Sequence, residues 1–122
     1  MGKTILIVDD SVTVRQQVGM ALGQAGFDVM EAGDGNEGIS AVASNPNIAM
    51  VVADINMPNM NGLDMVVEIK KSPNNASLPI LMLTTEGHPS LIKKAKEAGA
   101  IGWIVKPFNA TQLIATAKKL TA

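Results

Sequence analysis

Near its start the chain reads Ile5-Leu6-Ile7-Val8-Asp9-Asp10, four apolar residues followed at once by two acids. An unbroken apolar run of this length is typical of a strand that is covered on both faces, as in parallel sheets. Three more such runs follow, at residues 48–53, 80–83 and 103–105, and a weaker, more polar one lies at residues 27–31. We therefore expect five strands, of which the weakest is the most exposed.

The segments between these runs have the period of amphipathic helices. Apolar residues from Val14 to Ala25 recur at i, i+4, i+7, i+8 and i+11, and Gly26 and Gly99 are placed to end the first and fourth helices. Helices are expected at residues 14–25, 37–43, 62–71, 89–98 and 111–120. Strands that alternate with helices need crossover connections. The pattern predicts a doubly wound α/β fold, a mainly parallel five-stranded sheet with helices on both faces.

Length and composition narrow the class of protein. The chain has 122 residues, of which 47% are hydrophobic, enough to fill the core of one domain. It has no cysteine, which excludes disulfide scaffolds and thiol catalysis. A net charge of −1 argues against a nucleic-acid-binding surface. No apolar run approaches the ~20 residues of a membrane span and no signal peptide is evident, so we expect a cytoplasmic domain without membrane insertion.

The near-neutral total hides an uneven distribution of charge. Residues 1–87 carry four basic and ten acidic side chains, whereas residues 88–122 carry six basic and one acidic. Such an asymmetry can indicate that two parts of a domain have different tasks. A solvated lysine surface explains it equally well.

Polar side chains follow four of the predicted strands. They are Asp9 and Asp10, Asp54, Thr84 (with Thr85) and Lys106. The carboxyl ends of parallel strands lie at one edge of the sheet, where doubly wound folds bind their ligands. We therefore expect these side chains to converge on a single site.

Three carboxylates in such a site repel one another. Two unit charges about 4 Å apart cost about 4 kcal/mol at an effective dielectric constant of about 20, and Lys106 offsets only part of this. Either one acid is protonated or a divalent cation lies among them. Oxygen ligands without His or Cys favour Mg²⁺. A carboxylate, a Mg²⁺ site, a hydroxyl and a lysine are the groups that phosphoryl transfer needs.

Four short motifs resemble one family. They are Ile7-Val8-Asp9-Asp10, residues 54–62, Leu83-Thr84 and Val105-Lys106-Pro107-Phe108. Together they resemble the receiver domain of bacterial response regulators, most of all its stand-alone, CheY-like chemotaxis type. The resemblance covers residues 1–122. It implies a flavodoxin-like strand order 2-1-3-4-5 and a single receiver domain with no output domain.

The resemblance implies a phosphorylation site. Asp54 would accept a phosphoryl group from a phosphohistidine of a sensor histidine kinase. The ligands of Mg²⁺ would be Asp9, Asp10, Asp54 and the backbone carbonyl of Asn56. The protein would then be a two-component signalling switch and not a turnover enzyme.

Further roles follow from the same resemblance. Lys106 and the hydroxyl of Thr84 would bind the phosphoryl group, and Pro107 would follow Lys106 through a cis peptide bond. Asn56 and Glu86, each two residues beyond a site residue, would tune the hydrolysis of the phosphate.

The resemblance also implies a conformational switch that couples Thr84 to an aromatic residue on the last strand. Trp103 stands at that position, where Tyr or Phe is more usual. Its larger ring and the bulk of Thr85 lead us to expect that the inward state of the aromatic is harder to populate. The alternative is a half-buried strand aromatic whose indole N–H faces water.

The output surface implied by the resemblance lies at residues 89–120, where the positive charge gathers. The residues expected to form it are Lys93, Lys94, Trp103, Lys118 and Lys119. Complementary charge steers association, so we expect an acidic or amphipathic partner, such as a flagellar motor switch. A phosphatase is a further expected partner, and the chain is expected to be a monomer.

Other interpretations stay open. Asp9 could instead cap a helix that begins near Ser11. Asp34-Gly35 and Asn61-Gly62 are interpreted as turn signals only, and His88 is expected in a loop that faces solvent.

Other functions stay open as well. The chain could be a phosphorelay intermediate that passes phosphate to a histidine phosphotransferase. A third interpretation is a Mg²⁺-dependent phosphohydrolase. That class usually has a second acid at the position of Asn56, so the sequence disfavours it. A fourth interpretation is a flavin-binding domain. It needs a Ser/Thr/Gly-rich phosphate loop after the first strand, and Asp9-Asp10-Ser11 places negative charge there, so the sequence disfavours it.

Overall fold

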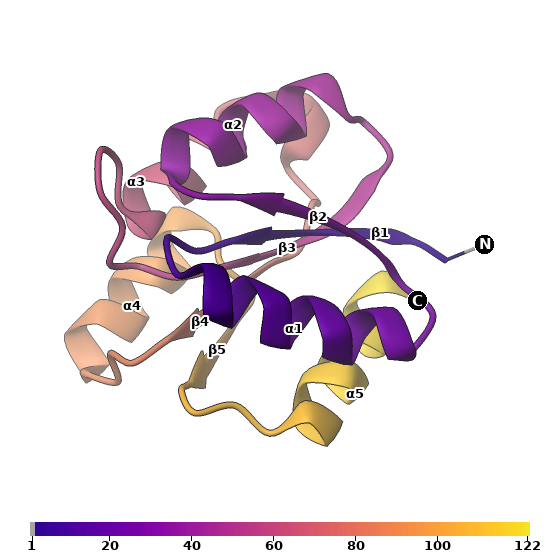
Figure 1. Ribbon diagram of the computed structural model, residues 1–122. Helices are drawn as coiled ribbons and strands as arrows, with labels where there is room; N and C mark the ends of the chain where they lie inside the picture. Colours follow the sequence, from indigo (N-terminus) through magenta and orange to yellow (C-terminus); the bar gives the residue numbers. More distant parts are fainter. Residues whose placement is uncertain (1) are drawn as a thin grey trace.

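The computed structural model describes residues 2–122, and within them strands and helices alternate as the sequence predicts (Figure 1). The strands are β1 (Thr4–Val8), β2 (Asp28–Ala32), β3 (Ile48–Ala53), β4 (Ile80–Thr84) and β5 (Gly102–Val105). The helices are α1 (Val12–Gln24), α2 (Gly35–Ser44), α3 (Gly62–Lys70), the 3₁₀ turn η1 (Pro73–Asn75), α4 (Pro89–Ala98) and α5 (Ala110–Thr121). The turn η1 was not expected from the sequence.

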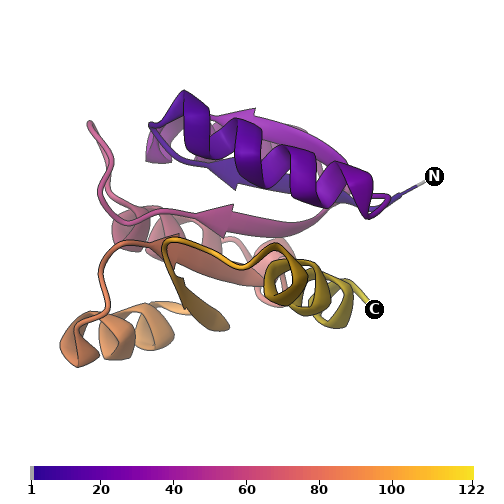
Figure 2. The same ribbon diagram turned by 60° about the horizontal axis from the view of Figure 1, so that its bottom comes forward.

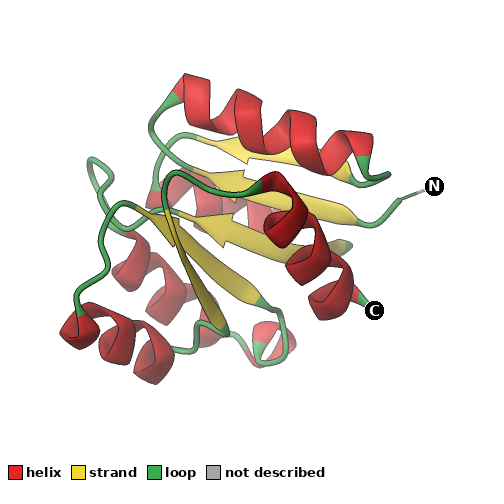
Figure 3. Cartoon of the chain, turned by 90° about the horizontal axis from the view of Figure 1, so that it is seen from below, coloured by secondary structure: helices red, strands yellow, loops and turns green. Residues whose placement is uncertain are grey.

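The strands form one parallel sheet in the order β2-β1-β3-β4-β5. Helices α1 and α5 cover one face, while α2, α3 and α4 cover the other (Figures 2 and 3). The predicted fold class and strand order are therefore confirmed. The winding reverses between β1 and β3, the place where a sheet of this kind opens a crevice at its carboxyl edge.

The unbroken apolar runs fill two separate layers of core. Successive side chains of a strand point to opposite faces. Leu6 and Val8 pack with α2, α3 and α4, whereas Ile5 and Ile7 pack with α1 and α5. All four of these side chains are at most 1% exposed. A strand buried on both faces needs apolar residues at every position, which is why these runs do not alternate.

The ends of the helices confirm some expectations and correct others. Gly26 and Gly99 have φ angles of 98° and 118°, in the left-handed region that favours glycine. Strand β2 begins one residue later than expected, because the amide of Asp28 is the one that bonds to Lys3 O (3.0 Å). The interpretation of Asp34 and Asn61 as turn residues only is wrong: they are the N-caps of α2 and α3.

Two further N-caps bear on the expectations. Ser11 is the N-cap of α1, since its hydroxyl accepts from the Val14 amide at 3.2 Å. His88 is exposed as expected, but it is the N-cap of α4 and accepts from the Ser90 amide through Nδ1 at 3.1 Å. None of the helices in residues 2–122 combines the length and the apolar character that a membrane crossing requires.

Candidate functional site

The predicted site residues converge at the carboxyl edge of the sheet, toward which the strand arrows in Figure 1 point. Asp9 and Asp10 follow β1, Asp54 follows β3, Thr84 ends β4 and Lys106 follows β5. The last residues of neighbouring strands are in register, since Val8 is the partner of Ala53. One carboxylate oxygen from each of the three aspartates lies within 4.8 Å of the other two.

Lys106 joins two of these carboxylates. Its Nζ lies 2.8 Å from Asp9 Oδ2 and 3.2 Å from Asp54 Oδ2. Asp9 and Asp54 are 3% and 8% exposed, so the ion pairs lie largely out of water. Burial lowers the pKa of Lys106, but the hydrogen bond that its ammonium donates to Asp9 and the charges of Asp54 and Asp9 outweigh the burial and leave that pKa above its ordinary value. Lys106 is therefore a firmly charged partner of the acids.

The second oxygens of the two buried acids bond to backbone amides. Asp54 Oδ1 accepts from the Ile55 amide at 2.7 Å, and Asp9 Oδ1 accepts from the Ser11 amide at 2.9 Å. Because Ser11 itself caps α1, the alternative in which Asp9 serves only as that cap does not describe this structure. Both carboxylates are held in fixed orientations.

A connected set of hydrogen bonds leads from the site toward the surface and passes through Glu86. The Glu86 amide donates to Thr84 Oγ1 at 3.3 Å, and its carbonyl accepts from Trp103 Nε1 at 2.9 Å. Its side chain accepts from Asn56 Nδ2 at 3.1 Å. Trp103 is half-buried on its strand, as the alternative expects, but its indole N–H has a protein partner, which contradicts the part of that alternative that places the N–H in water.

The donor set fits a hard divalent cation. Three carboxylates face one ammonium group, so the cluster keeps an excess of negative charge after the ion pairs are counted. All of the converging acidic groups offer oxygen, which Mg²⁺ prefers. Asp10 is exposed while Asp9 and Asp54 are buried, which leaves the cluster open to water on one side. Mg²⁺ commonly keeps several waters when it binds protein carboxylates.

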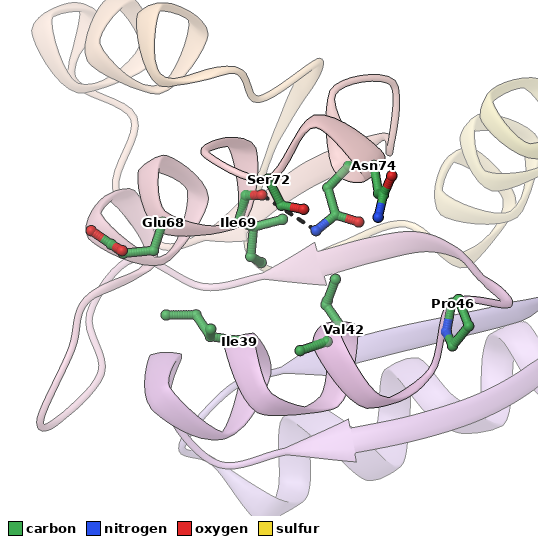
Figure 4. A pocket seen from close by; sticks show the side chains of 9 residues that line it. Ile39, Val42, Pro46, Glu68, Ile69, Ser72 and Asn74 are labelled. Carbon is green, nitrogen blue, oxygen red and sulfur yellow. Dashed lines mark hydrogen bonds between the residues drawn. The ribbon is translucent and has the colours of Figure 1, made fainter.

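The surface has two hollows of note, one beside the acidic cluster and one away from it. A largely apolar one of about 560 Å³ lies beside Lys106, between α1 and the loop after β5, with Val14, Gln17 and Phe108 in its wall. Another of about 400 Å³ lies between α2 and the end of α3 (Figure 4). Glu68 is the single charged residue in the lining of that second hollow, so it shares none of the groups of the acidic cluster.

Comparison with known proteins identifies the family. Residues 5–118 match the response regulator receiver domain. The chain belongs to the response regulator receiver family. A receiver domain is the signal-receiving part of a two-component system, so the chain is a signalling protein of that class.

Curated relatives of this receiver domain are chemotaxis proteins. Chemotaxis protein CheY1 of Helicobacter pylori is 39% identical over 106 residues, which are 86% of this chain and 86% of that protein. The chemotaxis protein CheY homolog of Campylobacter jejuni is 38% identical and covers 86% of this chain and 82% of its own length.

Solved structures show the same likeness. Chemotaxis protein CheY4 of Vibrio cholerae superposes with a TM-score of 0.92 at 37% identity, covering 98% of this chain and 99% of that one. A putative response regulator from Chloroflexus aurantiacus superposes with a TM-score of 0.93 at 31% identity, covering 99% and 98%. The receiver domain therefore shares both fold and family with CheY proteins.

Sequence reasoning missed three residues that support the site. Arg15 Nη1 donates to the carbonyl of Asp9 at 2.5 Å, while its Nε bonds to Glu31 at 2.9 Å. Asp34 and Asn59 bond to each other at 2.8 Å beside the loop that follows Asp54. Arg15 lies on the expected first helix, one turn after the acids, which is a signal that could have been used. No local pattern links Asp34 with Asn59.

Proposed function

We propose that this receiver domain is a phosphorylation-controlled switch of the chemotaxis type, with Asp54 as its phosphoacceptor. The observation that carries the proposal is the position of Asp54, a buried carboxylate of the acidic cluster that lies 3.2 Å from Lys106 Nζ. The chemotaxis assignment draws on the relatives that bear the name CheY.

The proposed reaction is transfer from a phosphohistidine of a sensor histidine kinase. An Asp54 carboxylate oxygen forms a bond to phosphorus as the P–N bond to the histidine breaks, and the electron pair stays on the imidazole nitrogen. The product is an acyl phosphate on Asp54, which water later hydrolyses to carboxylate and inorganic phosphate. Each molecule thus acts once on itself per cycle, and the protein signals without being a turnover enzyme.

Charge neutralisation in this step comes from several groups. Lys106 is charged and already within hydrogen-bond distance of Asp54, so its ammonium is placed to bind a phosphoryl oxygen. Asp9, Asp10, Asp54 and the carbonyl of Asn56 would hold Mg²⁺, which supplies positive charge to the transferring phosphoryl oxygens. Asp54 and Asp9 are both held by backbone amides, and this fixed geometry reduces the reorganisation that the reaction needs.

We assign the switch to Thr84 and Trp103. The Thr84 hydroxyl accepts from the Glu86 amide, and the Glu86 carbonyl accepts from Trp103, so a turn of the hydroxyl toward a phosphoryl group disturbs both contacts. Glu86 and Asn56 also bond to each other at the mouth of the site, which suits residues that control access of water to the acyl phosphate. Trp103 is half-buried in this structure, consistent with a ring that enters the inward state with difficulty.

The output surface is assigned to α4, β5 and α5. Its lysines, Lys93, Lys94, Lys118 and Lys119, are all exposed. Ile101, which directly precedes β5, and Val105, its last residue, are 58% and 47% exposed, which adds apolar area near Trp103. An acidic or amphipathic partner segment matches this mixture of positive charge and apolar contact. The hollow beside Lys106 offers a separate approach for the phosphohistidine of the kinase.

Phosphorylation by a small phosphodonor tests the central assignment. With Mg²⁺ and phosphoramidate, intact-protein mass spectrometry is expected to show one added phosphoryl group that is lost in mild base. Asp54→Asn is expected to abolish the addition, whereas Asp64→Asn, an exposed acid at the start of α3, leaves it unchanged. Phosphorylation that persists in Asp54→Asn would refute the proposal.

A further inference from the structure

The loop between β3 and α3 has an unusual backbone at Asn59. This residue has a φ angle of 67°, in the left-handed region that residues other than glycine seldom adopt. The same loop begins at Ile55, next to Asp54, and contains Asn56, whose carbonyl is the proposed backbone ligand for Mg²⁺. The shape of this loop therefore decides where that carbonyl lies.

The Asn59 side chain ties the loop to the start of α2. Its Nδ2 donates to Asp34 Oδ2 at 2.8 Å, while Asp34 Oδ1 accepts from the Glu37 amide at 2.9 Å as the N-cap of α2. One buried carboxylate thus uses one oxygen for the helix and the other for the loop. Figure 1 shows the loop beside the first turn of α2. We call the Asp34–Asn59 bond the latch.

Close backbone contacts on both sides of the latch hold the loop tightly. A Cβ at Gly35 would lie 2.8 Å from the carbonyl oxygen of Met60, so the loop approaches α2 as closely as a glycine allows. At the other end, a Cβ at Gly62 would lie 2.0 Å from the carbonyl oxygen of Asp54, and the Gly62 amide donates to Ile55 O at 2.9 Å. The two ends of the loop are thus packed against each other, Gly62 against Asp54 and Ile55, and the middle of the loop is latched to α2.

We propose that Asp34 is a positioning residue for the metal site, acting through Asn59 on the loop that presents the Asn56 carbonyl. Asp34 touches neither Asp54 nor the proposed ligands, so its effect is indirect. The inference rests on the proposed function, because it assumes that Mg²⁺ binds at the acidic cluster. Outer partners that orient metal ligands typically change affinity by about 10- to 100-fold when lost.

A charge-matched set of variants tests the latch. Asn59→Asp sets two carboxylates against each other and breaks it, although Asp still tolerates the left-handed backbone. Asn61→Asp adds the same charge to the same loop and keeps an N-cap for α3, so it serves as the control. The double variant Asp34→Asn/Asn59→Asp exchanges donor and acceptor, restores the bond and keeps the net charge of the wild type.

Mg²⁺ affinity and loop order are both measured. By calorimetric or NMR titration, Asn59→Asp is expected to bind Mg²⁺ about tenfold more weakly than wild type, the lower end of the range for outer partners. The control Asn61→Asp is expected to bind at least as tightly as wild type, because its added negative charge attracts the cation. The double variant is expected to return to within about twofold of wild type.

Loop order is followed without metal, so the latch is tested apart from the site. Amide hydrogen exchange at Gly62 is expected to speed up in Asn59→Asp and to slow again in the double variant. Equal Mg²⁺ affinity in Asn59→Asp and Asn61→Asp overturns the positioning role. A wild type that binds no Mg²⁺ overturns both the metal site and this inference, even where the exchange data show that the latch orders the loop.

Discussion

Lys106 sets the charge balance of the site at the scale of single residues. It is the one cation that the structure places in hydrogen-bond contact with the carboxylates of Asp9 and Asp54 among residues 2–122. Its side chain is 13% exposed, so both ion pairs are largely shielded from solvent screening. Removing the ammonium leaves two buried carboxylates without their partner.

Replacing Lys106 should destabilise the chain in a pH-dependent way. Lys106→Met is expected to lower the free energy of unfolding by on the order of 3 kcal/mol at neutral pH, the scale for breaking a buried pair. The pKa of Lys106 lies above its ordinary value of 10.5 in the folded chain. The folded state therefore holds this proton more tightly, and the stabilisation is complete below 10.5 and is lost as pH rises through the folded pKa.

Urea unfolding at about pH 8 and about pH 11 measures this effect in metal-free buffer. The difference between wild type and Lys106→Met should shrink at the higher pH. Lys119→Met, which removes an exposed lysine of α5, is the control and should show a small difference at both values. A Lys106 difference that is constant or grows with pH contradicts the assigned ion pairs.

The residues that sequence reasoning found and those that it missed differ in a physical way. Asp9, Asp54 and Lys106 each follow a buried strand directly, so the parallel topology alone predicts that they converge. Asp34 and Asn59 meet because a loop folds back on a helix, and their bond joins positions 25 apart in the chain. Nothing in a local pattern encodes such a contact. The nearby glycines Gly35 and Gly62 indicate that another part of the chain approaches the backbone closely there, but the sequence does not tell which part it is.

At the scale of elements, the helices and strands were predictable where their periodicity was strong. Strands β1, β3 and β4 are buried on both faces and were found almost to the residue, whereas edge strand β2 was displaced by one. Helix α2 was expected to start two residues late because Asp34-Gly35 also fits a turn. Turn η1, between α3 and β4, has no periodicity at all to reveal it.

Lys70 stabilises this connection between α3 and β4. Its ammonium donates to the carbonyls of Asn75, Ala76 and Leu78 at 3.1, 3.1 and 2.5 Å. It has no acidic partner among the salt bridges of residues 2–122, so these three carbonyls take the place of one. Partial burial lowers the pKa of Lys70. A lysine side chain thus adds three hydrogen bonds to a loop that is also held by backbone bonds, such as those from the Asn75 amide to Ser72 O (3.0 Å) and from the Leu78 amide to Asn75 O (3.1 Å).

Substitution of Lys70 should therefore cost more than substitution of its neighbour. Lys70→Met is expected to lower the free energy of unfolding by about 1–2 kcal/mol, since hydrogen bonds to a charged donor are lost and the freed carbonyls turn to water. Lys71→Met removes an exposed i,i+3 pair with Glu68 and should cost less than about 0.5 kcal/mol. Chemical unfolding followed by circular dichroism compares the two, and equal costs would show that the three carbonyl bonds contribute nothing.

At the scale of the whole molecule, charge is divided between two regions. The carboxylates gather at the carboxyl edge of the sheet, while α4 and α5 carry Lys93, Lys94, Lys118 and Lys119 in exposed positions. Each of these lysines is exposed, so none of them forms an enclosed binding site alone. Together they create a field that acts over roughly a Debye length, about 8–10 Å at physiological salt, and that field has the sign that attracts an acidic partner.

Association through this field should depend strongly on salt. An acidic amphipathic peptide should bind the phosphorylated chain with an association rate that falls about tenfold between about 20 mM and about 500 mM NaCl, because screening removes the steering. Lys93→Glu/Lys94→Glu should remove most of that dependence and slow binding at low salt. Lys71→Glu/Asn47→Asp/Asn74→Asp makes the same change in net charge at exposed positions outside α4, β5 and α5, and should leave most of it intact. Stopped-flow fluorescence of Trp103, the sole tryptophan, follows the reaction. Association rates that do not depend on salt, or that change equally in both charge variants, mean that the lysines of α4 are a solvated surface with no part in docking.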